Sequence, residues 1–208
     1  MNKADIFNEV ATGEKLVAIT FDDGPHPEWT PLLLDAFRQH GAKATFYVVG
    51  SNVERYPDIA ERIHAEGHEL GNHTYSHPHL SELGREAQRE ELSRTDRLIA
   101  EATGDCPKTF RPPYLDVNDD ALATAAEFGY AVIHALNLDS RDWDDAIDAE
   151  HILTTSRAHV REGSILIYHD GFGDRSPTIA AVSALIPELI GQGYRLVTVS
   201  ELLSARSR

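Results

Sequence analysis

The stretch Thr20-Phe21-Asp22-Asp23-Gly24-Pro25 directly follows four apolar residues, Leu16-Val17-Ala18-Ile19, that have the composition of a buried strand. Neighbouring side chains on a strand point to opposite faces of the sheet. Gly24 and Pro25 favour a sharp turn where the strand ends, and such a turn can direct both carboxylates into one pocket. Two acids in that place would suit a metal ligand beside a general base. Taken alone, the pair is equally compatible with an ordinary solvated turn.

Around this stretch, segments of strand length alternate with segments of helical periodicity along the whole chain. Strands are expected at 16–19, 44–49, 68–71, 109–111, 130–138, 164–168 and 194–199, and helices at 31–39, 57–66, 81–104, 118–128, 148–160 and 176–190. The alternation predicts a single α/β domain over residues 1–208, with a mainly parallel sheet that is either doubly wound or closed as a barrel. Glycine-rich phosphate-binding signatures are absent, and the length of 208 residues suits a (β/α) barrel of fewer than eight units.

The composition excludes several classes of partner. The net charge of −15 argues against binding to a nucleic-acid backbone or to an anionic membrane surface. The single cysteine, Cys106, excludes an internal disulfide framework and a cysteine-rich metal site. The eleven histidines are many for this length, and histidine is the commonest transition-metal ligand. Nothing in the sequence indicates an obligate protein partner.

The N-terminal residues carry no apolar core of a signal peptide, and no segment is apolar enough to span a bilayer. If Met1 is the native start, the expected location is the cytoplasm. If the chain was trimmed from a longer precursor, the expected location is outside the cell.

Polar residues gather just after the predicted strands. They are Asp22 and Asp23, His73 and His77, Arg111, Asp139 and Asp142, and His169 with Asp170. In α/β barrels the active site is built at the C-terminal ends of the strands. The sequence therefore predicts that these side chains meet at one end of a barrel.

His73 and His77 have the H-x-x-x-H spacing, which places two imidazoles on one face of a helical turn. Pro78 limits any helix here to one turn, and a tight turn would serve equally well. Two histidines and one carboxylate leave an open position on a metal, so we assign Asp23, His73 and His77 as ligands. Asp22 is then available as a base. This donor set suits Zn²⁺, although Co²⁺, Ni²⁺, Fe²⁺ or Mn²⁺ could also occupy it.

Three further positions each allow a structural and a functional interpretation. Arg111 could form a surface salt bridge or could orient Asp22 within the site. Trp143 could belong to the core or could line a pocket beside Asp142. His169 could be a satisfied core histidine or a second acid–base group whose pKa a carboxylate raises.

Five stretches resemble, in order, the five motifs of the polysaccharide deacetylase family, the NodB-homology group known as carbohydrate esterase family 4. They are Thr20-Phe21-Asp22-Asp23-Gly24-Pro25, His73-Thr74-Tyr75-Ser76-His77-Pro78, Arg111-Pro112-Pro113-Tyr114, Asp139-Ser140-Arg141-Asp142-Trp143 and Ile167-Tyr168-His169-Asp170. The resemblance runs over about 15–199, nearly the whole chain. It implies a distorted (β/α) barrel with about seven parallel strands.

The resemblance also implies a role for each catalytic position. Asp22 is similar to the general base, and His169 to the general acid that protonates the leaving amine. Arg111 is similar to the residue that orients the base. Either Asp139 or Asp142 is similar to the residue that tunes the acid.

The same resemblance implies the metal and substrate contacts. Asp23, His73 and His77 are similar to the metal ligands of the family. The backbone N–H of Tyr114 would help to stabilise the oxyanion, and Trp143 and Ile167 would line the acetyl-methyl pocket. Two residues depart from the family pattern: Leu115 stands where glycine is usual, and Ile167 where leucine is common. Both departures concern the shape of the pocket.

The expected function is metal-dependent removal of N-acetyl groups from a chitin oligosaccharide or a peptidoglycan-type N-acetylglucosamine. The alternatives are an O-acetyl esterase acting on xylan and a deacetylase of a small intracellular amide. A third alternative, from another class, is a carbohydrate-binding protein without turnover. The presence of both Asp22 and His169 argues against the third, because binding alone requires neither.

Overall fold

The computed structural model describes residues 3–207. Its strands are β1 (Ile6–Phe7), β2 (Leu16–Asp22), β3 (Thr45–Val48), β4 (Glu69–Asn72), β5 (Thr109–Phe110), β6 (Ala131–Ile133), β7 (Ser164–His169) and β8 (Arg195–Leu196). Its α-helices are α1 (Trp29–Gln39), α2 (Gly50–Arg55), α3 (Pro57–Ala65), α4 (Arg85–Thr103), α5 (Asp119–Glu127), α6 (Ala149–His159), α7 (Ser176–Gly191) and α8 (Val199–Ser204). Three short 3₁₀ helices are η1 (Leu80–Glu82), η2 (Pro113–Leu115) and η3 (Leu138–Ser140).

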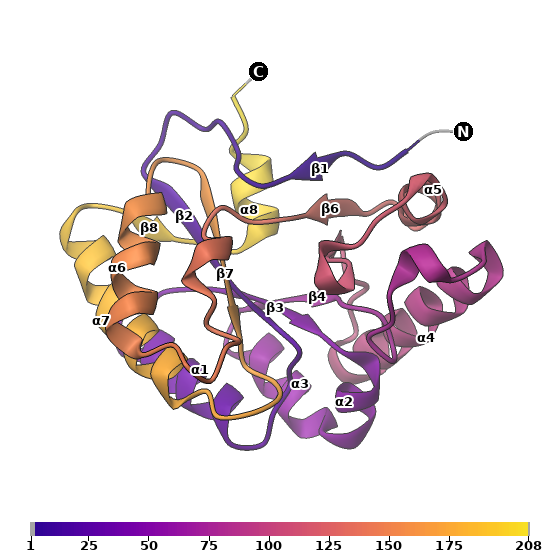
Figure 1. Cartoon of the computed structure of the whole chain (residues 1–208), viewed down its shortest axis with the longest axis horizontal. Coiled ribbons are helices and arrows are strands. Elements are labelled where there is room, and N and C mark those ends of the chain that lie inside the picture. Colours follow the sequence, from indigo (N-terminus) through magenta and orange to yellow (C-terminus); the bar gives the residue numbers. More distant parts are fainter. Residues whose placement is uncertain (1–2, 208) are drawn as a thin grey trace.

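The strands form one parallel sheet that curls into a distorted barrel. Seven of them follow the order β1-β6-β5-β4-β3-β2-β7, and β8 pairs with β2. Figure 1 shows α6 and α7 on one side of the strands, α1, α2 and α3 below them in this view, and α4 on the opposite side from α7. This architecture confirms the predicted (β/α) barrel with about seven parallel strands. Within the described residues, no helix has the length and apolarity that a membrane crossing requires.

Strand β2 explains how the barrel separates its core from its site. Its outward side chains, which include Ile19 and Phe21, pack in the largest core cluster against the surrounding helices. Its inward side chains begin with Leu16 and Ala18, which pack in a second apolar cluster inside the barrel. Alternation along the strand makes the next inward residues polar, namely Thr20 and Asp22. The barrel interior is therefore apolar at one end and polar at the other.

Several predicted boundaries were wrong. The strand expected at 130–138 ends at Ile133, because the chain leaves the sheet there and turns into η3. The helix expected to start at Ser81 starts at Arg85, with Gly84 as its N-cap. Ser81 lies in η1 instead, where its N–H donates to Asp116 Oδ2 at 2.9 Å. The strand expected at 194–199 is cut to Arg195–Leu196.

Besides the three 3₁₀ helices, one strand and two α-helices of the described residues were not predicted from the sequence. Strand β1 contains only two residues, too few for a periodicity. Helix α2 contains six residues and follows the β-branched pair Val48-Val49 without a side-chain cap. Helix α8 does carry a signal in the sequence, a capping box between Thr198 and Glu201.

Candidate active site

Asp22 and His169 lie beside one another at the ends of two neighbouring strands. They are partners in the parallel register of β2 and β7, which places both side chains on the same face. Thr20 and Ile167 are the preceding inward pair. Asp22 and His169 are 147 positions apart in the chain, and the register between β2 and β7 brings them together. The sequence pattern alone does not determine this register.

Asp23 turns into the same pocket because its backbone leaves the β conformation. Its φ is 74°, in the left-handed region that non-glycine residues seldom adopt. Asp23 Oδ1 lies 3.4 Å from His73 Nε2 and 3.1 Å from His77 Nε2. One ligand atom from each of these three residues lies within 4.8 Å of the other two. This spacing suits a single metal ion.

The three side chains fit a cation in their hydrogen bonding as well as in their spacing. His73 Nδ1 lies 2.6 Å from the carbonyl oxygen of Arg111, so this nitrogen carries the donated proton and Nε2 is left for a metal. Asp23 Oδ1 is buried without a hydrogen-bond partner. Burial disfavours the charged form of Asp23 and would raise its pKa. Hydrogen bonds and charge interactions with His73 and His77 outweigh this effect and hold the pKa of Asp23 well below its usual range. A buried acceptor facing two imidazole nitrogens is the donor set of a divalent transition metal.

Arg111 is fully buried beneath Asp22. Its Nη1 donates to Asp22 Oδ1 and to Thr20 Oγ1, each at 2.7 Å. Its Nε and Nη2 donate to the carbonyl oxygens of Ile133 and His134, at 3.2 and 3.0 Å. The guanidinium thereby fixes one oxygen of Asp22, while Asp22 Oδ2 lies 3.9 Å from His73 Nε2. Of the two interpretations of Arg111, the geometry supports orientation of the carboxylate and excludes a surface salt bridge.

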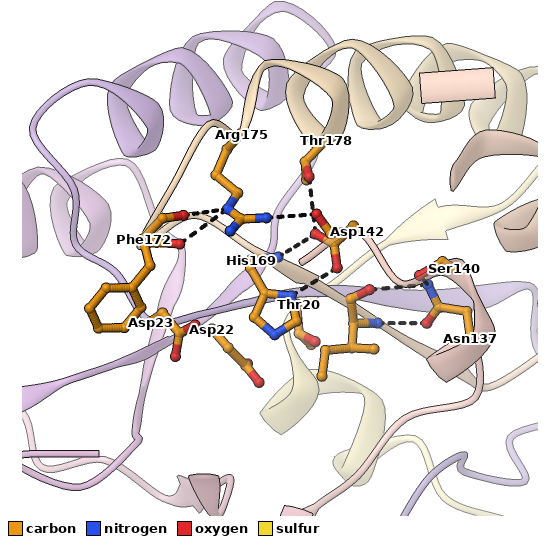
Figure 2. A network of polar contacts seen from close by, with 12 residues as sticks. Thr20, Asp22, Asp23, Asn137, Ser140, Asp142, His169, Phe172, Arg175 and Thr178 are labelled. Carbon is orange, nitrogen blue, oxygen red and sulfur yellow. Dashed lines mark hydrogen bonds and ion pairs between the residues drawn. The ribbon is translucent and has the colours of Figure 1, made fainter. Parts of the chain in front are cut away.

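His169 is paired with Asp142 (Figure 2). Asp142 Oδ1 lies 2.8 Å from His169 Nδ1, and Asp142 Oδ2 accepts from the backbone N–H of His169 at 2.8 Å. Thr178 Oγ1 donates to the same Oδ2 at 3.0 Å. Burial disfavours the imidazolium, but the charge and hydrogen bond of Asp142 outweigh that effect, and together with Asp23 and Asp22 they raise the pKa of His169 to about 9. His169 is therefore protonated at neutral pH.

Asp139, the other acid left open by the sequence, lies away from His169. Its Oδ1 is 2.8 Å from His159 Nε2, and its side chain is 65% exposed. The two aspartates separate because Arg141 adopts a left-handed φ of 48° between them. Of the two alternatives, the geometry supports Asp142 and places Asp139 in a surface ion pair.

The side chains of the two aspartates Asp22 and Asp23 and of the three histidines border one pocket of about 560 Å³. Its lining residues are Asp22, Asp23, His73, His77, Pro112, Tyr114, Leu115, Leu138, Ser140, Arg141, Asp142, Trp143, Ile167 and His169. Trp143 and Tyr114 are more than half exposed at its rim, whereas Ile167 is buried in its wall. Leu115, at the position where the resemblance leads one to expect glycine, has a φ of 55°, a conformation that favours glycine.

The sequence analysis did not identify two residues, Arg175 and Thr178, that support Asp142 and the loop after β7 through hydrogen bonds. Arg175 is buried and donates to the carbonyl oxygens of Phe172 and Asp142, each at 2.6 Å, and to that of Gly171 at 3.2 Å. Thr178, in the first turn of α7, donates its hydroxyl to Asp142 Oδ2. An arginine in a polar loop looks like a surface residue in the sequence, so no local signal could have identified Arg175.

Comparison with known proteins identifies the family. Residues 9–133 match the polysaccharide deacetylase family. The chain belongs to this family. The match contains the first three of the five motifs, and the longer pairwise similarities below extend over more of the chain. The sequence resemblance is thereby confirmed.

Among curated members of the family, the chain is 42% identical over 196 residues to a peptidoglycan-N-acetylglucosamine deacetylase of Bacillus cereus, covering 94% of this chain and 91% of that protein. It is 39% identical over 198 residues to a chitooligosaccharide deacetylase of Sinorhizobium fredii, covering 88% of this chain and 89% of the relative.

Solved structures of the family have the same fold. A peptidoglycan N-acetylglucosamine deacetylase in complex with 4-naphthalen-1-yl-N-oxidanyl-benzamide superposes with a TM-score of 0.90 at 32% identity, covering 99% of this chain and 94% of the other. A family 4 acetyl xylan esterase from Clostridium thermocellum, in complex with a cobalt ion, gives a TM-score of 0.86 at 34% identity, covering 91% of each chain.

Proposed function

We propose that this protein is a metal-dependent hydrolase that removes N-acetyl groups from N-acetylglucosamine units of an oligosaccharide or polysaccharide. One observation carries the proposal. A single pocket contains a carboxylate oriented by Arg111, an imidazole paired with Asp142, and a three-residue cluster suited to a metal. The curated relatives are named as deacetylases of such sugars, which supports the same substrate class here.

Asp23, His73 and His77 would hold the cation, which we expect to be Zn²⁺, with Co²⁺, Ni²⁺, Fe²⁺ or Mn²⁺ also compatible with the donors. When bound, the cation supplies Lewis acidity that polarises the acetyl carbonyl and activates water. The remaining chemistry belongs to side chains and backbone groups of the chain.

Asp22 is the proposed general base. Arg111 holds its Oδ1 at 2.7 Å, which leaves Oδ2 to accept a proton from the attacking water. The water oxygen bonds to the acetyl carbon, and the carbonyl oxygen takes up negative charge. Tyr114 is the second residue of η2, where the first N–H groups have no acceptor within the helix, so its N–H is suited to receive that charge.

His169 is the proposed general acid. Its raised pKa keeps it protonated at neutral pH, so it can deliver a proton to the nitrogen as the carbon–nitrogen bond breaks. The products are acetate and the free amine of the sugar. Trp143 and Ile167 would surround the acetyl methyl group, since both line the pocket with apolar surface.

The test is acetate release from N-acetylglucosamine oligomers by the zinc-loaded protein. We expect turnover that chelation abolishes and that added Zn²⁺ restores. Full activity in a chelated, metal-free preparation would refute the mechanism.

A second candidate is hydrolysis of O-acetyl esters, as on acetylated xylan. The structural likeness to an acetyl xylan esterase favours it, and the same base and acid would serve an ester. Acetate release compared across chitin oligomers, acetylated xylan and small acetamides would separate the two activities and the small-amide alternative. Affinity for glycans without turnover on any of these substrates would instead indicate a binding protein.

A further inference from the structure

Exposed apolar side chains gather around the mouth of the pocket. Of the seven large hydrophobic side chains that the described residues expose, four lie in the loops that follow the strands at this end of the barrel. They are Tyr114, Leu138, Trp143 and Phe172. The first three line the pocket, but Phe172 does not. Single exposed hydrophobic residues are common on protein surfaces, but a group of them at one opening indicates a binding surface.

Phe172 stands in the loop between β7 and α7, directly beyond the metal-site histidines. The residue is 57% exposed, and its ring centroid lies 6.2 Å from that of His77. Figure 2 shows the ring projecting from the loop on the side where Asp23 lies, away from Asp142. A ring in this position flanks the catalytic pocket instead of filling it.

The backbone of this loop is held firmly although the ring is exposed. Arg175 Nε donates to the Phe172 carbonyl at 2.6 Å, and Arg175 Nη1 ties the loop to the Asp142 carbonyl. From the other side, Trp29 Nε1 in α1 donates to the carbonyl oxygen of Gly173 at 3.1 Å. A fixed backbone limits the conformational entropy that the ring would lose on binding a ligand.

Phe172 also adopts an unfavourable backbone conformation. Its φ is 53°, and such conformations cost about 1–3 kcal/mol at a non-glycine residue. Burial of the side chain contributes little to offset that cost, because Phe172 is more than half exposed. Strained backbone conformations cluster at functional sites. Here the strained residue holds an aromatic ring in solvent beside the pocket, which suggests that the ring has a function.

We propose that Phe172 stacks on the pyranose ring of the sugar unit next to the one whose acetyl group enters the pocket. The proposal rests on the proposed function, since it assumes a chain of N-acetylglucosamine units. A pyranose presents a face of C–H groups, and the negative face of an aromatic ring attracts such positively polarised groups. The enzyme would accordingly prefer substrates of several units, and Phe172 would supply part of that preference.

The experiment compares kcat/KM for the N-acetylglucosamine monomer, which has no neighbouring unit, and for its tetramer. Phe172→Ala should lower the ratio of tetramer to monomer values by roughly threefold to tenfold, mainly through the KM for the tetramer, since stacking contributes about that factor. Phe172→Tyr should restore the ratio, whereas Phe172→Leu, which keeps apolar bulk without a flat face, should not. Equal losses for both substrates, or equal behaviour of the leucine and tyrosine variants, would overturn the proposal.

Leu32→Ala is the matched control, because Leu32 is 46% exposed on α1 and lies outside the pocket lining. It should leave the ratio unchanged. Calorimetric binding of the tetramer to Asp22→Asn, with and without Phe172→Ala, separates this inference from the proposed function. If tetramer binding depends on Phe172 but the unsubstituted, zinc-loaded protein releases no acetate, the hydrolase is refuted and the stacking role of Phe172 is sustained. If the protein releases acetate but Phe172→Ala changes neither binding nor the ratio, the hydrolase is sustained and the stacking role of Phe172 is refuted.

Discussion

At the scale of single residues, the Asp22-Asp23 pair divides its work through one backbone angle. Asp22 keeps the strand conformation and meets Arg111 inside the barrel. Asp23, with a φ of 74°, departs from the strand and meets His73 and His77. The two carboxylates therefore face different partners although they are adjacent in the chain.

This division predicts different failures for the two aspartates. Asp23→Ala should lose the metal, because it removes one of three ligands. Asp22→Asn should keep the metal and lower kcat by roughly 10²–10⁴-fold, the usual contribution of a general base. Bound zinc after dialysis, measured by elemental analysis beside acetate release, checks both. Equal loss of metal in the two variants would contradict the assignment.

The pairing of His169 with Asp142 predicts a pH dependence. The proposed general acid His169 must be protonated to act, so its pKa of about 9 predicts an alkaline limb of kcat/KM near that value. Asp142→Asn removes the main charge that raises this pKa while burial still lowers it, so the alkaline limb should move to lower pH. Asp139→Asn is the control, since Asp139 pairs with His159 on the surface, and it should leave the profile in place. A profile unchanged in Asp142→Asn would contradict the pairing.

At the scale of elements, the Asn137 side chain links the segment after β6 to β7, where β6 is too short to pair with β7 directly. Strand β6 ends at Ile133, and the segment after it bonds to β7 through Leu136 N–H and the carbonyl oxygen of Ile165 at 3.0 Å. The next contact is made by the amide of Asn137, which accepts from Ile167 N–H at 2.7 Å and donates to the Ile167 carbonyl at 3.0 Å (Figure 2). Asn137 thus takes the place of a missing strand residue behind the pocket wall.

Asn137→Ala should therefore destabilise the fold strongly. It would leave both backbone groups of Ile167 buried without partners, at a cost of about 2–4 kcal/mol. Asn118→Ala is the matched control, because Asn118 caps α5 through Ala121 N–H and adds only a long hydrogen bond, 3.4 Å, to the Ser81 carbonyl, so its loss should cost about 1 kcal/mol. Denaturant unfolding of the two variants measures the difference. A loss for Asn137 no larger than that for Asn118 would show that Asn137 does not close the barrel.

At the scale of the whole molecule, the N-terminal segment lies across the two ends of the sheet. Strand β1 pairs with β6, and the residues after it reach β7, where Glu9 bridges Ser164. Val10 N–H donates to the Gly163 carbonyl at 2.9 Å. Figure 1 shows this segment running alongside β6 and on toward the top of β7. The first strand and the last motif-bearing strand are thereby joined.

Gly163 is the point of closest approach in this junction. A Cβ at Gly163 would lie 1.7 Å from the carbonyl oxygen of Val10, and its φ is 81°. Gly41 also has a positive φ, 62°, but no atom within 4 Å of its Cβ position. Gly163→Ala should therefore cost about 1–3 kcal/mol more than Gly41→Ala in free energy of unfolding, the usual cost of overpacking. Thermal or denaturant unfolding that shows equal losses would contradict the junction.

The sequence by itself determined the elements whose signals are local. The apolar run before Asp22, the cap at Asn118 and the stop at Gly104 are fixed by neighbouring residues, and the structure contains each of them. The short strand β1 and the end of β6 could not be predicted, because they pair with each other and lie more than a hundred residues apart in the chain.

The tertiary structure decided which polar residues meet. Strand register placed Asp22 beside His169, and a left-handed residue, Arg141, directed Asp142 inward and Asp139 outward. Arg175 belongs to the site only because the β7–α7 loop folds back, so that the carbonyl oxygens of Gly171 and Phe172 accept hydrogen bonds from its side chain. The sequence specifies the kinds of side chain and the turns near them. Long-range register and backbone angles decide their directions, because these depend on contacts between segments that are distant in the chain.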